Sequence, residues 1–313
     1  MGGVVARCSK APDGVGADAK YKQDGGLGEL VTFNPQRARQ IPITVVMPTL
    51  NEAAQIRDAV AALAWADEVI VVDGGSSDRT PALARAAGAT VMHIADRTIA
   101  AQRNAGVATA RNRWVLALDA DERVTDELRL EFESVLAAPQ HAAYRIRMQN
   151  IYFGCEFRHG GWGRDWHVRL FTRERRFVER RVHEQLEPVS DVGSLSAPLK
   201  HTPHRDLTHH LEKMICYARW GAEDLRARGR RANVWDVTAV PMWRFVREYV
   251  MYAGWRDGRR GLVVAALSAC AALLKYAHLF ALEWQGTPVQ ATPLPQPRPG
   301  ALVVPRFEGE PTH

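Results

Sequence analysis

The segment that most constrains this chain is Trp114–Leu118, five apolar residues in a row, followed by Asp119-Ala120-Asp121-Glu122. A short apolar run of this kind predicts a strand that is buried on both faces, as in a parallel sheet. Such a strand would place Asp119 and Asp121 at its carboxyl end, where ligands bind in open α/β sheets. Two carboxylates one residue apart can share a divalent cation with a diphosphate. The alternative is a solvated acidic turn, because Asp-x-Asp is a common tripeptide.

Strand-like and helix-like patterns alternate from about residue 41 to residue 138. Strands are expected at residues 43–47, 68–73, 89–92 and 114–118. This order predicts an α/β fold with a mostly parallel, doubly wound sheet. After Ala142 the pattern changes to alternating apolar and charged residues, as in 144–148 and 168–171, which is typical of half-exposed antiparallel or edge strands. Amphipathic helices are expected from about residue 206.

Composition divides the 313 residues into four parts. We expect a disordered N-terminal extension (1–40), a catalytic domain (41–200), a helical region that associates with a membrane (201–285) and a proline-rich disordered tail (286–313). The net charge of +6 and the pI of about 9.3 favour anionic partners such as nucleotide phosphates, anionic lipid or nucleic acid. The four cysteines lack metal-ligand spacing, and no secretory signal is expected.

Polar, glycine-rich turns follow the first two predicted strands. Asn51 and Glu52 can hold a nucleoside beside a helix N-terminus, or can cap that helix. After the second strand, Asp73 can accept a hydrogen bond from a base, and Asp78 is also expected to cap the next helix. Arg103, on a later helix, can contact a diphosphate or can lie on a solvated face. All these turns would meet at one edge of the sheet.

The ordered series of motifs resembles the family-2 glycosyltransferases of the GT-A fold over about residues 42–185. The residues that carry the resemblance are Thr49, Asn51, Glu52, Asp73, Ser76, Asp78, Thr80, Asn104, Gly106, Asp119 and Asp121. Segments 64–68, 119–123, 165–171 and 182–184 further resemble bacterial lipopolysaccharide-core glucosyltransferases of the β-1,4 type. One departure is Gly74-Gly75, where many members have a single Gly-Ser.

The resemblance implies an enzyme that takes its sugar from a nucleotide-diphosphate donor, expected to be UDP-glucose, and inverts the anomeric centre in one displacement. The implied nucleotide-sugar-binding residues are Thr49, Asn51, Glu52, Asp73, Ser76, Asp78, Arg103, Asn104 and Asp119. Asp121, together with Asp119, would bind Mg2+ or Mn2+. Such a displacement needs a base that deprotonates the acceptor hydroxyl, and a metal that stabilises the leaving diphosphate.

The general base is expected after the metal motif, across the sugar from it. Asp165 is the first choice, because it lies in a glycine-rich loop with Trp162 and Trp166, which would form an apolar wall for the sugar. His183 and Glu184 are the second choice. The alternatives are an ion pair between Asp165 and a neighbouring arginine, and ordinary core packing for the tryptophans.

Positive charge and an apolar helix give two indications of the acceptor and the location. The segment from 158 to 181 holds eight arginines and three acidic residues, which suits a phosphorylated acceptor such as a lipid A–core saccharide, or is a solvated basic loop. Residues 262–274 are apolar and follow Arg259-Arg260. Lys275 and His278 then break the apolar pattern. This run is too short to span a bilayer and favours a helix at the membrane interface, with a buried helix as the alternative.

We therefore expect an inverting, metal-dependent glycosyltransferase that acts on lipopolysaccharide core or a related cell-envelope glycan. Its acceptor would be a lipid-linked saccharide, its location the cytoplasmic face of the bacterial inner membrane, and nucleic acid would not be a partner. The alternatives are sugar transfer to a polyprenyl phosphate, a haloacid-dehalogenase-type phosphatase, and a nucleotide-binding scaffold without activity. The phosphatase motif has Thr or Val at the position that Arg123 occupies in this sequence.

Overall fold

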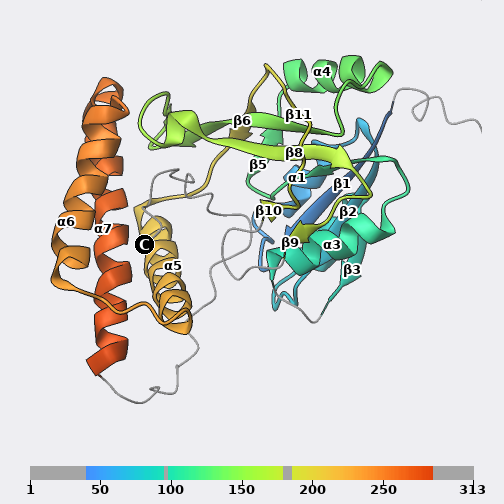
Figure 1. The fold of residues 1–313 in the computed structure, drawn as a ribbon. Helices are drawn as coiled ribbons and strands as arrows, with labels where there is room; N and C mark the ends of the chain where they lie inside the picture. Colours follow the sequence, from blue (N-terminus) through green and yellow to red (C-terminus); the bar gives the residue numbers. More distant parts are fainter. Residues whose placement is uncertain (1–39, 95–97, 179–184, 285–313) are drawn as a thin grey trace, which may run out of the picture. The chain divides into compact units, whose positions relative to one another are not determined.

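The computed structural model describes residues 40–94, 98–178 and 185–284. The expected N-terminal extension and proline-rich tail lie outside these residues, and so do His183 and Glu184. Within the described chain, an α/β unit is followed by a group of helices (Figure 1). The fold is α/β with a mostly parallel sheet in its N-terminal half, as the sequence predicts.

The first half of the sheet consists of four parallel strands in the order β3-β2-β1-β4. Their bounds are β1 Ile41–Thr49, β2 Ala66–Asp73, β3 Thr90–His93 and β4 Trp114–Ala117. The apolar runs form the strands that were predicted from them, because strands covered on both faces need apolar side chains on both sides. The order places the ends of β1, β2 and β4 next to one another.

Helices cover the two faces of this half-sheet. They are α1 Ile56–Ala61, α2 Thr80–Ala86, α3 Ile99–Thr109 and α4 Asp126–Ala137. Alternate residues of β1 point to opposite faces, as the period of a strand requires. Val45 packs in the cluster that includes Ile56 of α1, whereas Val46 packs in the cluster that includes Val107 of α3.

The second half of the sheet is mixed and continues in the order β8-β6-β12-β5. Its strands are β5 Glu122–Val124, β6 Ala143–Tyr152, β7 Cys155–Glu156, β8 Trp166–Thr172, β11 Val192–Ser194 and β12 Leu199–His201, and β9 Phe177–Val178 pairs separately with β10 Gln185–Leu186. The antiparallel pairing of β6 with β8 is confirmed. Of the two alternatives, antiparallel or edge strand, β8 is an antiparallel strand inside the sheet, because it lies between β4 and β6.

Three long helices follow the sheet and pack on one another (Figure 1). The elements are α5 Leu207–Ala227, α6 Val234–Val246, the π-helical turn η3 Arg247–Met251, the 3-10 turn η4 Gly254–Asp257 and α7 Gly258–Trp284. Side chains from all three helices, including Ala222, Val237 and Leu279, form their shared core. Asp206 begins α5 by accepting a hydrogen bond from the backbone N–H of His209.

The length of α7 corrects one expectation. Lys275 and His278 do not end the apolar helix, which continues to Trp284 and has 27 residues. At about 1.5 Å per residue it is roughly 40 Å long, more than the hydrocarbon core of a bilayer. By length and composition alone, the described stretch Gly254–Trp284 could therefore cross a membrane, and the statement that this segment is too short to span is wrong.

Gly106 brings α3 close to the sheet, and replacing it tests this contact. A Cβ atom at Gly106 would lie 2.4 Å from Cγ1 of Val46 and 3.0 Å from Cγ2 of Val72. Helix propensity alone favours Ala over Gly by about 1 kcal/mol. We expect Gly106→Ala to lower the free energy of unfolding by about 1–3 kcal/mol instead, because valine side chains have few alternative rotamers and overpacking strains the core. Urea unfolding measures the change.

Ala108→Ser, at an exposed position of the same helix, is the matched control and should change stability by less than about 0.5 kcal/mol. If Gly106→Ala is as stable as the wild type or more stable, the close packing of α3 on β1 and β2 is not as described.

Candidate active site

The carboxyl end of β4 carries a buried group of acids and arginines. Asp119 accepts hydrogen bonds from Arg103 Nη2 at 2.6 Å and from Arg169 Nη2 at 3.2 Å. Arg169 also forms an ion pair with Glu122, whose Oε2 accepts a hydrogen bond from the backbone N–H of Asp119 at 2.9 Å. The two guanidinium groups thus hold the turn after β4 in one conformation. The solvated acidic turn is excluded, because Asp119 and Asp121 are each 8% exposed.

The electrostatics of Asp119 follow from these contacts. Burial by itself raises the pKa of Asp119, but the neighbouring Arg103 and Arg169 outweigh it and hold this pKa well below its ordinary value. Asp119 is therefore ionised. Arg103 is 3% exposed, so it does not lie on a solvated face, and its guanidinium also lies 5.2 Å from the ring centroid of Phe177. Its expected contact with a diphosphate stays a prediction.

Asp121 has a different environment. Its Oδ1 is buried and has no hydrogen-bond partner among the described residues, and it lies 3.7 Å from Nε2 of His201. Burial raises the pKa of Asp121 well above its ordinary value; Lys213 opposes this shift, and the carboxylates of Asp119, Glu122 and Glu52 add to it. A buried carboxylate with an unpaired oxygen is suited to a bound cation.

The protonation of His201 supports the same conclusion. Asn150 donates its Nδ2 hydrogens to the carbonyl oxygen of Trp162 (2.9 Å) and to Oδ2 of Asp165 (3.4 Å), so its Oδ1 is an acceptor. His201 Nδ1, 2.7 Å from that oxygen, must therefore carry a hydrogen. Burial lowers the pKa of His201 to about 3, so its Nε2 is unprotonated and presents a lone pair toward Asp121.

These groups fit the divalent cation that the family resemblance implies. Asp121 Oδ1 and His201 Nε2 are two acceptors on one side of a buried site, which is the arrangement of a ligand pair. No cluster of three or more His, Cys, Asp or Glu ligands occurs within the described residues. Mg2+ in nucleotide enzymes commonly uses one or two carboxylates and takes its other ligands from phosphate oxygens and water. Asp119 is engaged with two arginines and is the weaker candidate ligand.

Hydrogen bonds connect the turn after β1 to the turn after β2. Asn51, in the left-handed region (φ 58°), donates its backbone N–H to Oγ of Ser76 and accepts from the backbone N–H of Ser77. Asp78 accepts from the backbone N–H groups of Ala53 and Thr80. Asp78 thus supports the start of α2, although Arg79 is the N-cap residue. Asn51, Ser76 and Asp78 therefore shape the turns by their own contacts.

Asp73 and Glu52 lie at the ends of β2 and β1. Asp73 Oδ2 accepts hydrogen bonds from the backbone of Gly75 and Ser76, whereas its Oδ1 is buried and has no partner among the described residues. Glu52 is 4% exposed and accepts a hydrogen bond from Gln55. Gly75 adopts a φ of 91°, which favours glycine, so the second glycine of the Gly-Gly pair is required by this turn.

Two predicted nucleotide-binding residues have structural contacts. Thr49 is fully buried and donates its hydroxyl to the carbonyl oxygen of Val72. Asn104 makes two hydrogen bonds with the backbone of Phe177, at 2.9 Å and 2.7 Å. Both side chains hold strands and helices of the site together, and their expected contact with a donor stays a prediction.

Asp165 belongs to the same network as the acids after β4. It is 4% exposed, and its Oδ1 lies 2.7 Å from Nε2 of His167. The expected alternative for Asp165 was an ion pair with an arginine; the recorded partners are instead His167 and Asn150. The contacts Asp165–Asn150–His201–Asp121 connect the candidate base to the candidate metal ligand through two intervening side chains.

The two tryptophans of this loop differ. Trp162 is buried in a cluster with Tyr152, Phe157 and Val264, so core packing is its role in the structure. Trp166 is 40% exposed and lies against the guanidinium of Arg145, 5.2 Å from its ring centroid. Only Trp166 is therefore placed to contact a sugar from solvent.

Comparison with known proteins identifies the family. The family model "Glycosyl transferase family 2" matches residues 44–207, just over half of the chain. The chain belongs to glycosyl transferase family 2. It is 25% identical over 250 residues to the lipopolysaccharide core biosynthesis glycosyltransferase LpsC of Rhizobium meliloti, which covers 77% of this chain and 93% of that protein.

Two solved structures are also similar to this glycosyltransferase. TarS residues 1–349 of S. aureus in complex with UDP matches 78% of this chain and 92% of that chain, at 14% identity and a TM-score of 0.43. Glucosyl-3-phosphoglycerate synthase of Mycobacterium tuberculosis, in complex with Mn2+, UDP and glucosyl-3-phosphoglycerate, matches at 23% identity with a TM-score of 0.31. The match covers 37% of this chain, and less than half (46%) of the synthase chain.

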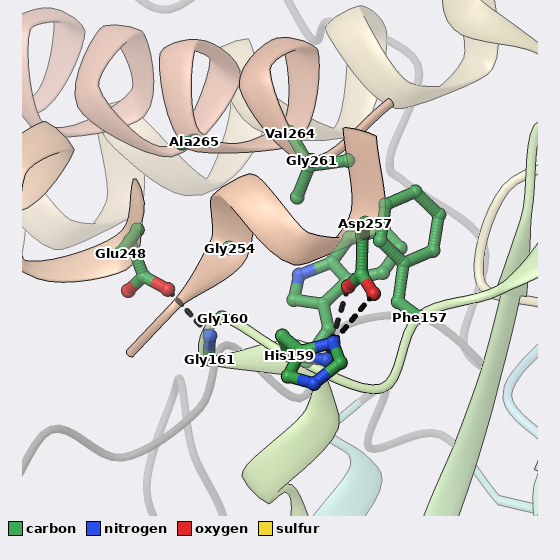
Figure 2. Close-up of a pocket in the computed structure, with 11 residues that line it drawn as sticks. Phe157, His159, Gly160, Gly161, Glu248, Gly254, Asp257, Gly261, Val264 and Ala265 are labelled. Atoms are coloured by element: carbon green, nitrogen blue, oxygen red, sulfur yellow. Dashed lines mark hydrogen bonds and ion pairs between the residues drawn. The ribbon is translucent and has the colours of Figure 1, made fainter. Parts of the chain in front are cut away.

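The C-terminal helices of the glycosyltransferase hold the loop that leads to Asp165. Figure 2 shows Glu248 beside the backbone of Gly161, which donates to its Oε2 at 2.6 Å. In the same view Asp257 accepts from the backbone N–H of His159 at 3.0 Å and lies 2.8 Å from its Nδ1. These contacts connect the helical region to the short helix η2 (Trp162–Arg164), directly before the candidate base.

Sequence reasoning missed several residues of the site: Glu122, Asn150, Arg169, His201 and Lys213. Arg169 and Glu122 lie inside motifs that carried the family resemblance, so their positions could have been singled out. His201, on β12, and Lys213, on α5, are far along the chain from Asp121, and no sequence spacing indicates that they meet it.

A pair of stacked histidines, one just before α5 and one in its first turn, makes stability depend on pH. His210 and His204 stack with ring centroids 3.9 Å apart, and burial, with Lys213, lowers the pKa of His210 from 6.5 to about 4. The unfolded chain takes up this proton below about pH 6.5 while the folded chain does not. The contribution of His210 to stability should therefore be constant above pH 6.5 and fall by about 1.4 kcal/mol per pH unit between pH 6.5 and pH 4.

Urea unfolding between pH 7.5 and pH 4.5 tests this expectation. His210→Phe keeps a stacked ring without a titrating nitrogen, so its stability should depend less steeply on pH than that of the wild type. Leu211→Phe, at an exposed position of the same helix, adds a ring without changing a titrating group; it is the control and should keep the wild-type slope. Equal slopes in wild type and His210→Phe would contradict the assignment.

Proposed function

We propose that this family-2 glycosyltransferase inverts the anomeric centre of a nucleotide-diphosphate sugar in a metal-dependent single displacement. The observation that carries the proposal is the chain of contacts from Asp121 through His201 and Asn150 to Asp165. It connects a carboxylate suited to a metal–diphosphate with a carboxylate suited to a base, on neighbouring strands of one sheet. Glu52 and Asp73, at the adjacent strand ends, would hold the nucleoside.

In this mechanism Asp165 accepts the proton of the acceptor hydroxyl while that oxygen attacks the anomeric carbon. The bond from this carbon to the diphosphate oxygen breaks, and the diphosphate leaves with the bonding electrons. His167 and Asn150 orient the Asp165 carboxylate through their hydrogen bonds, and each of its oxygens keeps a lone pair for the proton. The base is buried, and catalytic hydrogen bonds often become properly aligned only when substrate binds.

Asp121 and His201 would hold the cation, and Arg103 and Arg169 would keep Asp119 ionised beside it. A bound Mg2+ or Mn2+ supplies charge stabilisation for the leaving diphosphate. The nitrogen of His201 favours Mn2+ over Mg2+, because imidazole is a poor ligand for the harder ion.

The proposed donor is UDP-glucose and the proposed acceptor is a saccharide of lipopolysaccharide core or a related cell-envelope glycan. The likeness to LpsC over most of both chains supports the acceptor class. Transfer to a polyprenyl phosphate remains the rival within the family, and assaying transfer to extracted core lipid against polyprenyl phosphate separates the two. Membership of family 2 excludes the phosphatase, and measured turnover would exclude the scaffold.

Nucleotide binding and turnover test the two carboxylates separately. With Mn2+, UDP should raise the melting temperature of the wild type more than GDP or ADP does. Asp121→Ala should lose this stabilisation, because the metal–diphosphate loses its carboxylate. Asp165→Asn should keep it but lower kcat by a factor of about 10²–10⁴, because only the general base is removed. Differential scanning fluorimetry and a UDP-release assay measure the two effects.

Asp126→Asn, an exposed carboxylate at the start of α4, is the control and should behave as the wild type in both assays. If Asp121→Ala is stabilised by UDP as much as the wild type is, Asp121 does not hold the metal. If Asp165→Asn turns over normally, Asp165 is not the base.

We also propose that the helical region binds the cytoplasmic face of the inner membrane. Among the described residues, the exposed large apolar side chains lie between Leu207 and Trp284, apart from Leu130, Trp166 and Val178. Trp235, Trp243, Trp255 and Trp284 are among them. Tryptophans of this kind favour the bilayer interface, and the exposed Arg259-Arg260 pair at the start of α7 suits anionic lipid.

Association without spanning suits the packing of α7. It shares a core with α5 and α6. The charged residues Arg219 and Glu223 of α5 lie near His278 of α7. A spanning α7 would have to bring these charges into the hydrocarbon or leave its helical partners, and both are costly. Extraction of cell membranes with carbonate should therefore release the protein, whereas a spanning helix would keep it in the membrane.

Vesicle flotation tests the membrane surface. The protein should float with vesicles that contain anionic lipid and bind neutral vesicles less. Trp235→Ser combined with Trp243→Ser should lower the bound fraction several-fold, because each exposed tryptophan contributes apolar area to the interface. Leu130→Ser, which removes an exposed apolar side chain of α4, is the control and should leave binding unchanged. Unchanged binding of the double variant would contradict the proposed surface.

A further inference from the structure

A lysine of α5 enters the site from outside the residues that the family model matches. The match ends at residue 207, and Lys213 lies on the second turn of α5. Its side chain is 3% exposed, and its Nζ donates a hydrogen bond to the carbonyl oxygen of Pro203 at 3.1 Å. Asp206 begins the helix in an orientation that turns His210 and Lys213 inward. The position of this ammonium group is thus set by the helix start.

Lys213 lies among the residues that are proposed to bind the donor. It lines one pocket with Glu52, at the end of β1, and Asp121, after β4. Thr202 and Arg205 of the β12–α5 connection and His209 of α5 complete this pocket. The pocket therefore lies between the turn proposed for the nucleoside and the carboxylate proposed for the metal. In a nucleotide-diphosphate sugar, the group between those two points is the diphosphate.

The chemistry of an ammonium group fits this place. Lysine has three N–H donors, and the contact with Pro203 uses one of them. Burying a lysine is unfavourable unless charged or polar partners compensate. On the basis of the proposed function, we infer that Lys213 binds the diphosphate of the donor and stabilises the negative charge that develops on it as the sugar leaves. The helical region then contributes to donor binding as well as to location.

A purely structural role makes a different prediction. If Lys213 only neutralises Asp121 and Glu52, its removal changes the stability of the protein and affects the affinities for uridine and UDP equally. If it binds the diphosphate, its removal lowers the affinity for UDP and leaves the affinity for uridine unchanged. Calorimetric titration of the full chain with uridine and with UDP, each with Mn2+, distinguishes the two roles without any measurement of activity.

Lys213→Met keeps the length of the side chain and removes its charge. We expect the Kd for UDP to rise by at least about tenfold, which corresponds to about 1.4 kcal/mol, with the Kd for uridine unchanged. Lys213→Arg keeps the charge and should restore most of the UDP affinity. Lys200→Met, at an exposed lysine of β12, is the matched control and should bind both ligands as the wild type does.

The outcomes separate this inference from the proposed function. Equal UDP affinity of wild type and Lys213→Met overturns the inference alone, and so does an equal loss of UDP and uridine. A wild type that binds neither ligand overturns both. Should Lys213→Met fail to fold, the Nζ–H nuclear magnetic resonance signal of Lys213 in the unmutated protein decides the question: UDP should shift it and uridine should not, and an unshifted signal with bound UDP overturns the inference.

Discussion

The site depends on holding several negatively charged side chains close together at the ends of two strands, where they are buried from water. Asp119, Asp121, Glu122 and Glu52 meet where β1 and β4 end, and all are nearly buried. Like charges in such a place repel each other and are poorly solvated, so the fold must supply cations. Two guanidinium groups bind Asp119 and Glu122, whereas Asp121 has one buried oxygen that forms no hydrogen bond within the described part of the chain. This unequal compensation leaves an oxygen of Asp121 open to the proposed cation, whereas both oxygens of Asp119 contact arginines.

Elements that come later in the chain place further polar groups beside these acids. β12 brings His201 next to Asp121, and α5 brings Lys213 into the pocket beside it. The helices also hold the loop before Asp165, through Glu248 and Asp257. If the helical region lies on a membrane, as proposed, the groups proposed to bind the donor and to position the base are attached to the element that would meet a lipid-linked acceptor.

Several features could be predicted from sequence because they are local. The apolar runs of β1, β2 and β4 indicate buried parallel strands, and polar turns after parallel strands necessarily share an edge. Other features depend on register and were missed. The alternation in β8 indicates a strand but does not tell that it lies between β4 and β6, so the contact of Arg169 with Asp119 was not foreseen. The apolar length of α7 was underestimated because one lysine does not interrupt a helix.

By itself the sequence determined the α/β order, the family and the carboxylates after β4, because these follow from local patterning and from motifs with defined spacing. The tertiary structure alone decided which charge meets which. Pairing of β12 with β6 and β5 brings His201 to Asp121, and the docking of α5 brings Lys213. Contacts between residues about 80 or more positions apart depend on how strands pair and helices pack, and no single segment of the chain encodes them.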